Sequence, residues 1–404
     1  MDQSIIDSYS TFNEFSPHFW FLAMLGYMKI VHENVTDRTK FVQNIYRVIV
    51  VFIIFTYNIQ HIIFVYQQRD NSDLLIDSLF MLLTTLVTFS KHLVFNFSSG
   101  IDVIVEFIRD PKFLPSHDEH VKMMKENASK MYKMLIAFVM AVETSCIFYP
   151  VYHYMNRHKF GITSYFPFDS SQSPIFEVTI IYLAVILSVI GSGNAAMDIT
   201  LVSFYSQAKI QIRILRFNLE HLTDFDESTK IASQDINTGR NDYFYDIADE
   251  AYRNLVQSRV IKCVEHYKHI TRFLIKVESV FREAMTVQLL VCSWVNCITA
   301  YKAVGLSVMS AEFMSMFVYL SCIVFELYIN CYYGAQVEDE SQFVNQSLYF
   351  CEWSRLSPSF RKQLIIMTYC FCRPLTPKVA YVVPLSLNTF VSVSHHLTYI
   401  KKYF

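Results

Sequence analysis

The chain has 404 residues, of which 53% are hydrophobic, 16% aromatic and only 17% charged, and its net charge is −2. Soluble domains carry about 25% charged residues, so the composition is typical of a membrane protein and opposes an ordinary soluble one. The near-neutral charge gives no bulk attraction to nucleic acid, and we expect no nucleic-acid partner.

Seven stretches are long and apolar enough to cross a bilayer as helices, which takes about 20 residues each. They predict an all-α polytopic membrane protein with seven transmembrane helices at 41–66, 75–98, 131–156, 176–205, 283–307, 311–334 and 385–404. The last stretch is the weakest, because it contains two His and two Lys. The segment from Met1 to Ser16 is polar and has no basic region before an apolar one, so we expect no cleaved signal peptide.

The distribution of Lys and Arg predicts the orientation of these helices. Basic residues concentrate in the segments that lie inside when the N-terminus is inside, whether or not the long insert 206–282 is counted. Cytosolic loops carry the excess of Lys and Arg in membrane proteins. The sequence therefore predicts an inverted topology, with the N-terminus inside and the C-terminus outside.

The spans divide the chain into six segments. Four are 1–40, a cytosolic N-terminal segment; 41–205, helices one to four; 206–282, a cytosolic insert; and 283–334, helices five and six. Within the insert, apolar residues at helical spacing extend helix four and precede helix five, around a polar and mobile loop at about 223–247. Residues 335–384 are the intracellular anchor segment, in which about 341–372 holds too much charge for a lipid-facing span and is predicted to be an amphipathic helix. The final segment is 385–404.

A polar stripe runs down this last segment, which we predict to be a pore-lining helix. Its members follow one another at spacings of 4, 3, 4 and 3, which places them on one helix face: Asn388, Ser392, His395, Tyr399 and Lys402. A polar face of a spanning helix meets protein or water rather than lipid. The alternative is a polar seam buried between helices of one subunit.

Other polar residues give no support for catalysis. Nucleophile-elbow, P-loop, HExxH and CxxC patterns are absent from the sequence, so we expect no enzyme, no catalytic residue and no cofactor. Glu143 and Glu326 fall inside predicted spans, where they are either functional or paired with a hydroxyl or amide of a neighbouring helix. His117 and His120 lack a third ligand, and we expect no metal site.

Several motifs together resemble the insect odorant receptor family. They are Phe166-Pro167-Phe168-Asp169 and Ser173-Pro174 before helix four, Asp198 within it, Cys331-Tyr332-Tyr333-Gly334, Ser341, Trp353, and Pro384-Leu385-Ser386-Leu387 with Thr389-Phe390. The resemblance implies an odorant-gated non-selective cation channel in which four subunits surround one pore. It also implies a split seventh helix, with an inner half at about 341–372 and a pore-lining outer half at 385–404.

The same resemblance implies partners and a ligand pocket. The chain would be the ligand-sensing subunit, binding a small hydrophobic volatile and assembling with the odorant receptor co-receptor in the lipid of the plasma membrane of a sensory neuron dendrite. The implied pocket faces lie on helices two, three, four and six: Met81, Thr84, Thr85, Ser145, Cys146, Tyr149, Tyr152, Ile181, Tyr182, Val185, Phe313, Met314 and Phe317.

One departure from the family pattern concerns the outer end of the pore. Family members carry an apolar residue after the matching Thr-Tyr pair, whereas Thr398-Tyr399 is followed here by Ile400, Lys401 and Lys402. A ring of four Lys suits anions rather than cations. We therefore expect that the chain forms no conducting homotetramer, unless both Lys side chains extend to the outer surface.

Two other receptor families remain as alternatives. A gustatory receptor channel has the same fold, and Thr398-Tyr399 with Phe404 faintly resembles its terminal pattern. The Pro384–Leu387 run favours the odorant branch. A G-protein-coupled receptor would need an outside N-terminus, which the distribution of Lys and Arg opposes.

Overall fold

The computed structural model describes most of the chain as long helices. The described residues are 9–31, 36–70, 72–155, 164–168, 172–224, 250–305, 311–351, 353–356, 358–380 and 382–393. A few side chains within these ranges, including those of Tyr149, Tyr152 and Met314, are not described.

The elements follow one another along the chain as helices, with one short hairpin near the end. The helices are α2 (Thr11–Met24), α3 (Asp37–Gln67), α4 (Ser72–Phe97), α5 (Ser99–Arg109), η1 (Pro111–Phe113), α6 (Asp118–Met155), α7 (Ile175–Glu220), α10 (Glu250–Gly305), α11 (Ala311–Gln342), α12 (Val344–Phe350), η2 (Trp353–Arg355) and α13 (Pro358–Phe371). Strands β1 (Lys378–Val379) and β2 (Val383–Pro384) pair antiparallel, with Lys378 opposite Pro384.

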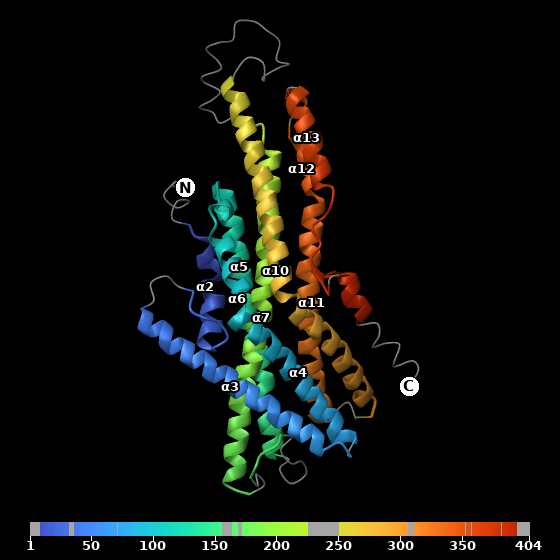
Figure 1. Ribbon diagram of the computed structural model, residues 1–404. Coiled ribbons are helices and arrows are strands. Elements are labelled where there is room, and N and C mark those ends of the chain that lie inside the picture. The colour runs from blue at the N-terminus through green and yellow to red at the C-terminus, as the bar shows by residue number, and fades with distance from the viewer. Residues whose placement is uncertain are drawn as a thin grey trace.

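Helix α7 is the central column of the bundle. Its side chains are buried on every face between Ala195 and Ile212, as expected of a helix surrounded by others. Helices α4, α6, α10 and α11 all pack against it, and α10 and α11 run along the same long axis (Figure 1). By contrast, α3 crosses obliquely and exposes apolar side chains such as Phe41, Val48 and Phe52, as lipid-facing helices do.

The first six predicted spans lie within α3, α4, α6, α7, α10 and α11, apart from one or two residues at some ends. Among the described residues, three helices are long and apolar enough to cross a membrane: Asp37–Gln67, Ser78–Phe97 and Ile175–Glu220. The seventh predicted span is described only as a helical stretch at 387–393.

Residues 341–372, which were predicted to form one anchor helix, form several shorter elements instead. The prediction of a single helix was therefore wrong. Helix α11 continues to Gln342, and α12, η2 and α13 follow as separate elements. Cys351 ends α12 in an extended conformation, and Pro358 begins α13. Proline is well suited to the first position of a helix, where its missing N–H is not needed, which favours the start of α13 at Pro358. Helix α12 packs beside the end of α7, where the Ser347 hydroxyl donates to Glu220 at 2.7 Å.

Two helices were not predicted from the sequence. Helix α2 buries Phe12, Phe15, Phe19 and Leu22 in the main core, and it lies in a stretch whose beginning is polar. Helix α5 buries Ile101, Ile104, Val105 and Ile108 on one face. Both are too short or too polar to span a bilayer, so a search for transmembrane stretches passes over them.

Candidate functional site

Three ionisable side chains meet inside the bundle, from three different helices. Lys91 of α4 lies with its Nζ atom 2.7 Å and 2.9 Å from the two carboxylate oxygens of Asp198 on α7. The same Nζ atom lies 2.9 Å from Oε1 of Glu326 on α11. The three residues are 3%, 1% and 8% exposed. A buried charge is tolerated only when it is paired, so the cluster fixes α4, α7 and α11 relative to one another.

Two amide side chains complete this network. Asn194 of α7 accepts from Lys91 Nζ at 3.0 Å through its oxygen, and its nitrogen donates to Glu326 Oε2 at 3.2 Å. Gln288 of α10 donates its amide hydrogen to Glu326 Oε1. Glu326 therefore accepts from residues of three other helices, so α10 is joined to the same network.

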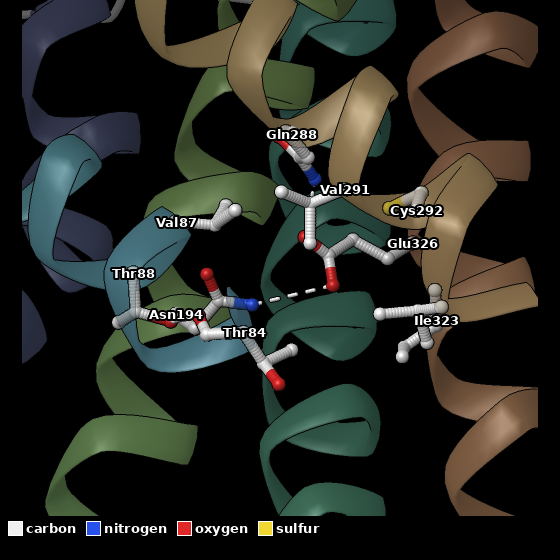
Figure 2. A pocket seen from close by; sticks show the side chains of 10 residues that line it. Thr84, Val87, Thr88, Asn194, Gln288, Val291, Cys292, Ile323 and Glu326 are labelled. Atoms are coloured by element: carbon white, nitrogen blue, oxygen red, sulfur yellow. Dashed lines mark hydrogen bonds between the residues drawn. The ribbon is translucent and has the colours of Figure 1, made fainter. Parts of the chain in front are cut away.

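A cavity lies directly against this network (Figure 2). The part of it that a water-sized group can occupy is about 20 Å³, and the surrounding empty volume of about 290 Å³ includes open solvent. The lining mixes small apolar residues with the polar groups of the network: Thr84, Val87, Thr88, Asn194, Gln288, Val291, Cys292, Val295, Ile323 and Glu326. Its lining, mainly apolar with a few convergent polar groups, has the composition of a small-molecule site, while its free space in this conformation is about that of one water.

Of the pocket residues implied by the resemblance, Thr84 lines this cavity. Thr85 is buried one residue further along α4, where its hydroxyl donates to Asn58 of α3 at 3.0 Å. Met81 packs against the main core, and Cys146 of α6 donates through its sulfur to the Leu187 carbonyl at 3.5 Å. These side chains support the bundle around the cavity.

Other implied pocket residues lie elsewhere. Ile181, Val185 and Phe317 have exposed side chains. Phe313 stacks on Phe317, with the two ring centroids 6.4 Å apart. Tyr182 is half-buried against Phe166.

The remaining four members of the predicted pocket either bond within their own helix or lie outside the described residues. The Ser145 hydroxyl donates to the Ala141 carbonyl one turn back on its own helix. The side chains of Tyr149, Tyr152 and Met314 lie outside the described residues.

Two of the five predicted pore-lining residues are described. Asn388 and Ser392 are exposed, and the Ser392 hydroxyl donates to the Asn388 carbonyl at 2.8 Å, which places the two on one face of a helix. His395, Tyr399 and Lys402 lie outside the described residues.

Both intramembrane acids have partners within the described part of the chain. Glu143 of α6 accepts from the Ser192 hydroxyl of α7, a pairing of the kind that the sequence left open. Glu326 is paired with an ammonium as well as with two amides, and the ammonium was not anticipated. The sequence signal that could have revealed this ammonium is Lys91 itself. It lies in the middle of an apolar stretch, and such a residue must find a partner within the bundle.

The two His residues considered as metal ligands pack instead on an aromatic ring. His117 and His120 meet edge to face at 5.1 Å between ring centroids, and both lie against Phe217. Burial lowers the pKa of His120 to about 4. Across the described residues, no group of three or more potential ligands could hold a metal ion.

Comparison with known proteins decides the family. The model of the 7tm odorant receptor family matches residues 71–396, which is most of the chain. The chain is an odorant receptor family member. The family consists of receptors rather than enzymes, and its match favours the odorant branch over the gustatory alternative.

Individual odorant receptors are similar to the chain at low identity. Odorant receptor 2a of Drosophila melanogaster is 24% identical over 36% of this chain, and the match spans only 37% of that relative. Odorant receptor Or1 of Anopheles gambiae is 20% identical over 78% of this chain and 77% of its own length. The odorant receptor coreceptor of Aedes aegypti is 22% identical over 34% of this chain and 29% of its own.

The fold of this odorant receptor family member is that of a solved insect receptor. The olfactory receptor OR5 from Machilis hrabei, in complex with eugenol, superimposes with a TM-score of 0.76 over 95% of both chains at 13% identity. The structure of OR5 alone gives 0.74 over 96% of both chains. At this identity the match establishes the fold and, with it, an all-helical membrane protein.

Proposed function

We propose that the chain is the ligand-sensing subunit of an odorant-gated, non-selective cation channel built with the odorant receptor co-receptor. The family match over residues 71–396 carries the proposal, and we place the ligand at the small cavity beside Glu326, where the surrounding helices would have to move apart to admit it. Apolar lining such as Val87, Val291 and Ile323 would hold a volatile molecule by burial, at about 25 cal/mol per Å² of apolar area.

The proposed orientation has the N-terminus in the cytosol and the C-terminus outside, in the plasma membrane of a sensory dendrite. The basic insert and the pieces α12 and α13 then lie inside, and the helix beginning near Leu387 runs outward to line the shared pore. Epitope tags at the two ends test this directly. Staining of an N-terminal tag on intact cells would contradict it.

The proposed stoichiometry follows from Lys401 and Lys402, which we expect near the outer end of the pore. Four copies would set a ring of like charges across a cation path. A pore built mainly from co-receptor subunits would dilute this charge. The chain would therefore conduct in the heteromer and not alone.

Gating in this proposal depends on differential affinity. A ligand opens the pore only if it binds the open state more tightly than the closed one. The cavity contacts α4, α7, α10 and α11, so a bound molecule would act on four helices at once.

The experiment is a current recording from cells that express the tagged chain with the co-receptor, the chain alone, or the co-receptor alone. A panel of volatiles should evoke a cation current that appears only with both subunits, beyond any response of the co-receptor itself. A robust ligand-gated current from the chain alone would overturn the stoichiometry. A silent heteromer at the cell surface would overturn the channel assignment.

A further inference from the structure

A second cavity lies where the junction of α4 and α5 meets the segment after α2. Water-sized groups can occupy about 180 Å³ of it, and since one water needs about 10–15 Å³ of such space, a group of several heavy atoms fits. We call it the boundary cavity. Its lining combines apolar and polar side chains: Met28, Lys29, Phe95, Asn96, Phe97, Ser98, Ser99, Ile101 and Asp102.

The boundary cavity lies at the edge of the membrane-spanning part of the chain. The apolar span Ser78–Phe97 of α4 ends at its wall. Asn96 of that wall accepts from Arg47 of α3, with Nε and Oδ1 2.6 Å apart. The neighbouring Tyr46 is exposed, and its hydroxyl donates to the Met24 carbonyl at 3.0 Å. Exposed Tyr and a cation at one level are typical of the boundary between lipid and water.

Helix α3 supplies an apolar surface beside the boundary cavity. Its Gln43 side chain donates to the carbonyl of Met28, a lining residue, at 2.9 Å. Further along α3, Ile45, Val48 and Phe52 have exposed side chains and follow one another at spacings of 3 and 4, which places them in one stripe. Acyl chains can lie along this stripe while the polar head of the same lipid reaches the cavity.

The polar lining carries charges of both signs and hydroxyl groups. Lys29 Nζ lies 2.6 Å from Asp102 Oδ1, and both side chains are about half exposed. The Ser98 oxygen accepts from the Gly100 amide at 3.1 Å, which leaves its hydrogen for a ligand. The Ser99 hydroxyl is exposed at the same wall. The cavity therefore offers an ammonium and two hydroxyls as donors, and a carboxylate as an acceptor.

A phosphate fits the donors of this set, because it can accept from Lys29 and from both hydroxyls. In that place it also draws Lys29 away from Asp102 and sets a like charge beside that carboxylate. A ligand that carries its own cation next to the phosphate removes this cost. A primary ammonium does so best, because it donates N–H bonds to the carboxylate and a quaternary ammonium has none to donate.

We propose that the boundary cavity binds the head of an aminophospholipid, with the phosphate at Lys29, Ser98 and Ser99 and the primary ammonium at Asp102. This binding site is separate from the ligand cavity beside Glu326 and goes beyond the proposed channel function. Only the leaflet rests on that function, since the proposed orientation makes this boundary the inner one.

Three lipids with the same dioleoyl chains test the proposal. Phosphatidylethanolamine has a primary ammonium, phosphatidylcholine has a quaternary one, and phosphatidylglycerol has no cation. Each is added to the full-length chain in detergent, fused to a fluorescent protein, and binding is measured as the rise in thermal unfolding midpoint. We expect phosphatidylethanolamine to stabilise the chain at a concentration about tenfold lower than the other two require.

The variant Asp102→Asn keeps the shape of the side chain and removes the partner of the ammonium. It should reverse the preference, so that phosphatidylglycerol acts at a lower concentration than phosphatidylethanolamine. Glu106→Gln is the matched control, because it makes the same change of charge at an exposed position one turn further along α5, outside the cavity lining. This control should keep the preference of the wild-type chain.

A soluble head without acyl chains, glycerophosphoethanolamine, separates a lipid from a free phosphate compound. It should not stabilise the chain at the concentrations at which the lipid does, because it cannot use the apolar stripe of α3. Stabilisation by the soluble head as strong as that by the lipid would overturn the assignment of a lipid.

Two other results would overturn the proposal: phosphatidylglycerol or phosphatidylcholine as effective as phosphatidylethanolamine with the wild-type chain, or an unchanged preference in Asp102→Asn. The wild-type comparison stands even if a variant fails to fold. Because binding is read without current, a silent channel would count against the proposed channel function and not against the lipid site.

Discussion

Lys91 and Asp198 lie 107 residues apart in sequence and form a two-oxygen ion pair in the middle of the bundle, with Nζ to Oδ distances of 2.7 Å and 2.9 Å. The pair joins α4 to α7, and Glu326 extends it to α11 at 2.9 Å. The cavity lies against this junction. The three helices around it therefore cannot separate without exposing charge to apolar surroundings.

Replacing the buried cation Lys91 is expected to lower the stability of the fold far more than replacing a surface cation. Lys91→Met leaves two carboxylates buried without their cation, and breaking a buried pair in this way costs about 3–5 kcal/mol. The measurement is the thermal unfolding midpoint of the fluorescently tagged chain in detergent, with the yield of monodisperse protein. Lys29→Met is the control, because Lys29 pairs with Asp102 at 2.6 Å with both side chains 47% exposed.

The exposed pair of Lys29 and Asp102 should contribute less than about 1 kcal/mol to the free energy of unfolding. Adding Asp198→Asn to Lys91→Met should restore part of the lost stability, since it removes one uncompensated charge. Equal losses from Lys91→Met and Lys29→Met would show that the buried network does not hold the helices together.

A buried histidine on the predicted cytosolic part of α10 should make the chain sensitive to acid. Burial, with the neighbouring His269 and His120, lowers the pKa of His266 from 6.5 to about 3. The unfolded chain therefore binds a proton below about pH 6.5, while the folded chain does not until near pH 3, so stability falls as the pH falls through this window.

We expect His266→Gln to lose less stability between pH 7 and pH 5 than the wild-type chain loses, in unfolding midpoints taken at each pH. The wild-type side chain donates from Nε2 to Gln211 Oε1 at 2.8 Å, and a Gln amide can replace that donor. The exposed His221, replaced by Gln in the same way, is the control. If both variants follow the wild-type pH profile, His266 is not an acid-sensitive group.

A close contact between α7 and the segment after α2 should exclude even a methyl group. A Cβ atom at Gly193 would lie 2.2–2.6 Å from carbons of the Tyr27 ring. Overpacking of this kind costs about 1–3 kcal/mol, although alanine regains about 1 kcal/mol of helix propensity. Gly193→Ala should thus lower the unfolding midpoint, and Tyr27→Leu in the same chain should restore part of it. A midpoint unchanged by Gly193→Ala would contradict the contact.

The polar face of the last helix can be tested by chemical accessibility. With the co-receptor present, Asn388→Cys should become sensitive to a charged, water-soluble thiol reagent, which then blocks the ligand-evoked current. Leu387→Cys is the control, because Leu387 is also exposed and lies on another face of the same helix. The wild-type chain, with exposed Cys370 and Cys372, sets the background. Equal block of the two variants would remove the polar stripe from the pore.

Hydropathy predicted the long spans because each is a local run of apolar residues, and the positions of α3, α7 and α11 follow from such runs. Helix α2 was not predicted, although Phe12, Phe15, Phe19 and Leu22 recur at helical spacing, because the apolar face is short and follows a polar start. The interruptions between α11, α12 and α13 were not predicted, because the stretch was interpreted as one amphipathic helix.

The site itself was less predictable for a physical reason. Lys91 and Glu326 are 235 residues apart, and Asn194 and Gln288 come from two further helices, so their meeting depends on tertiary packing. The sequence marked Glu326 as an intramembrane acid and Asp198 as part of the family pattern. It could not pair them with Lys91, because helix spacing alone does not say which faces of distant helices meet.

The most direct test of the central claim fills the cavity in a working receptor. Cells co-expressing the tagged chain and the co-receptor are recorded with a volatile panel, once with the wild-type chain and once with Ile323→Phe, which places a ring in the cavity. We predict a ligand-evoked cation current with the wild-type chain. For Ile323→Phe we predict at least a tenfold loss of sensitivity (about 1.4 kcal/mol) at unchanged surface expression. A current of unaltered sensitivity in Ile323→Phe would contradict the assignment of this cavity as the ligand site.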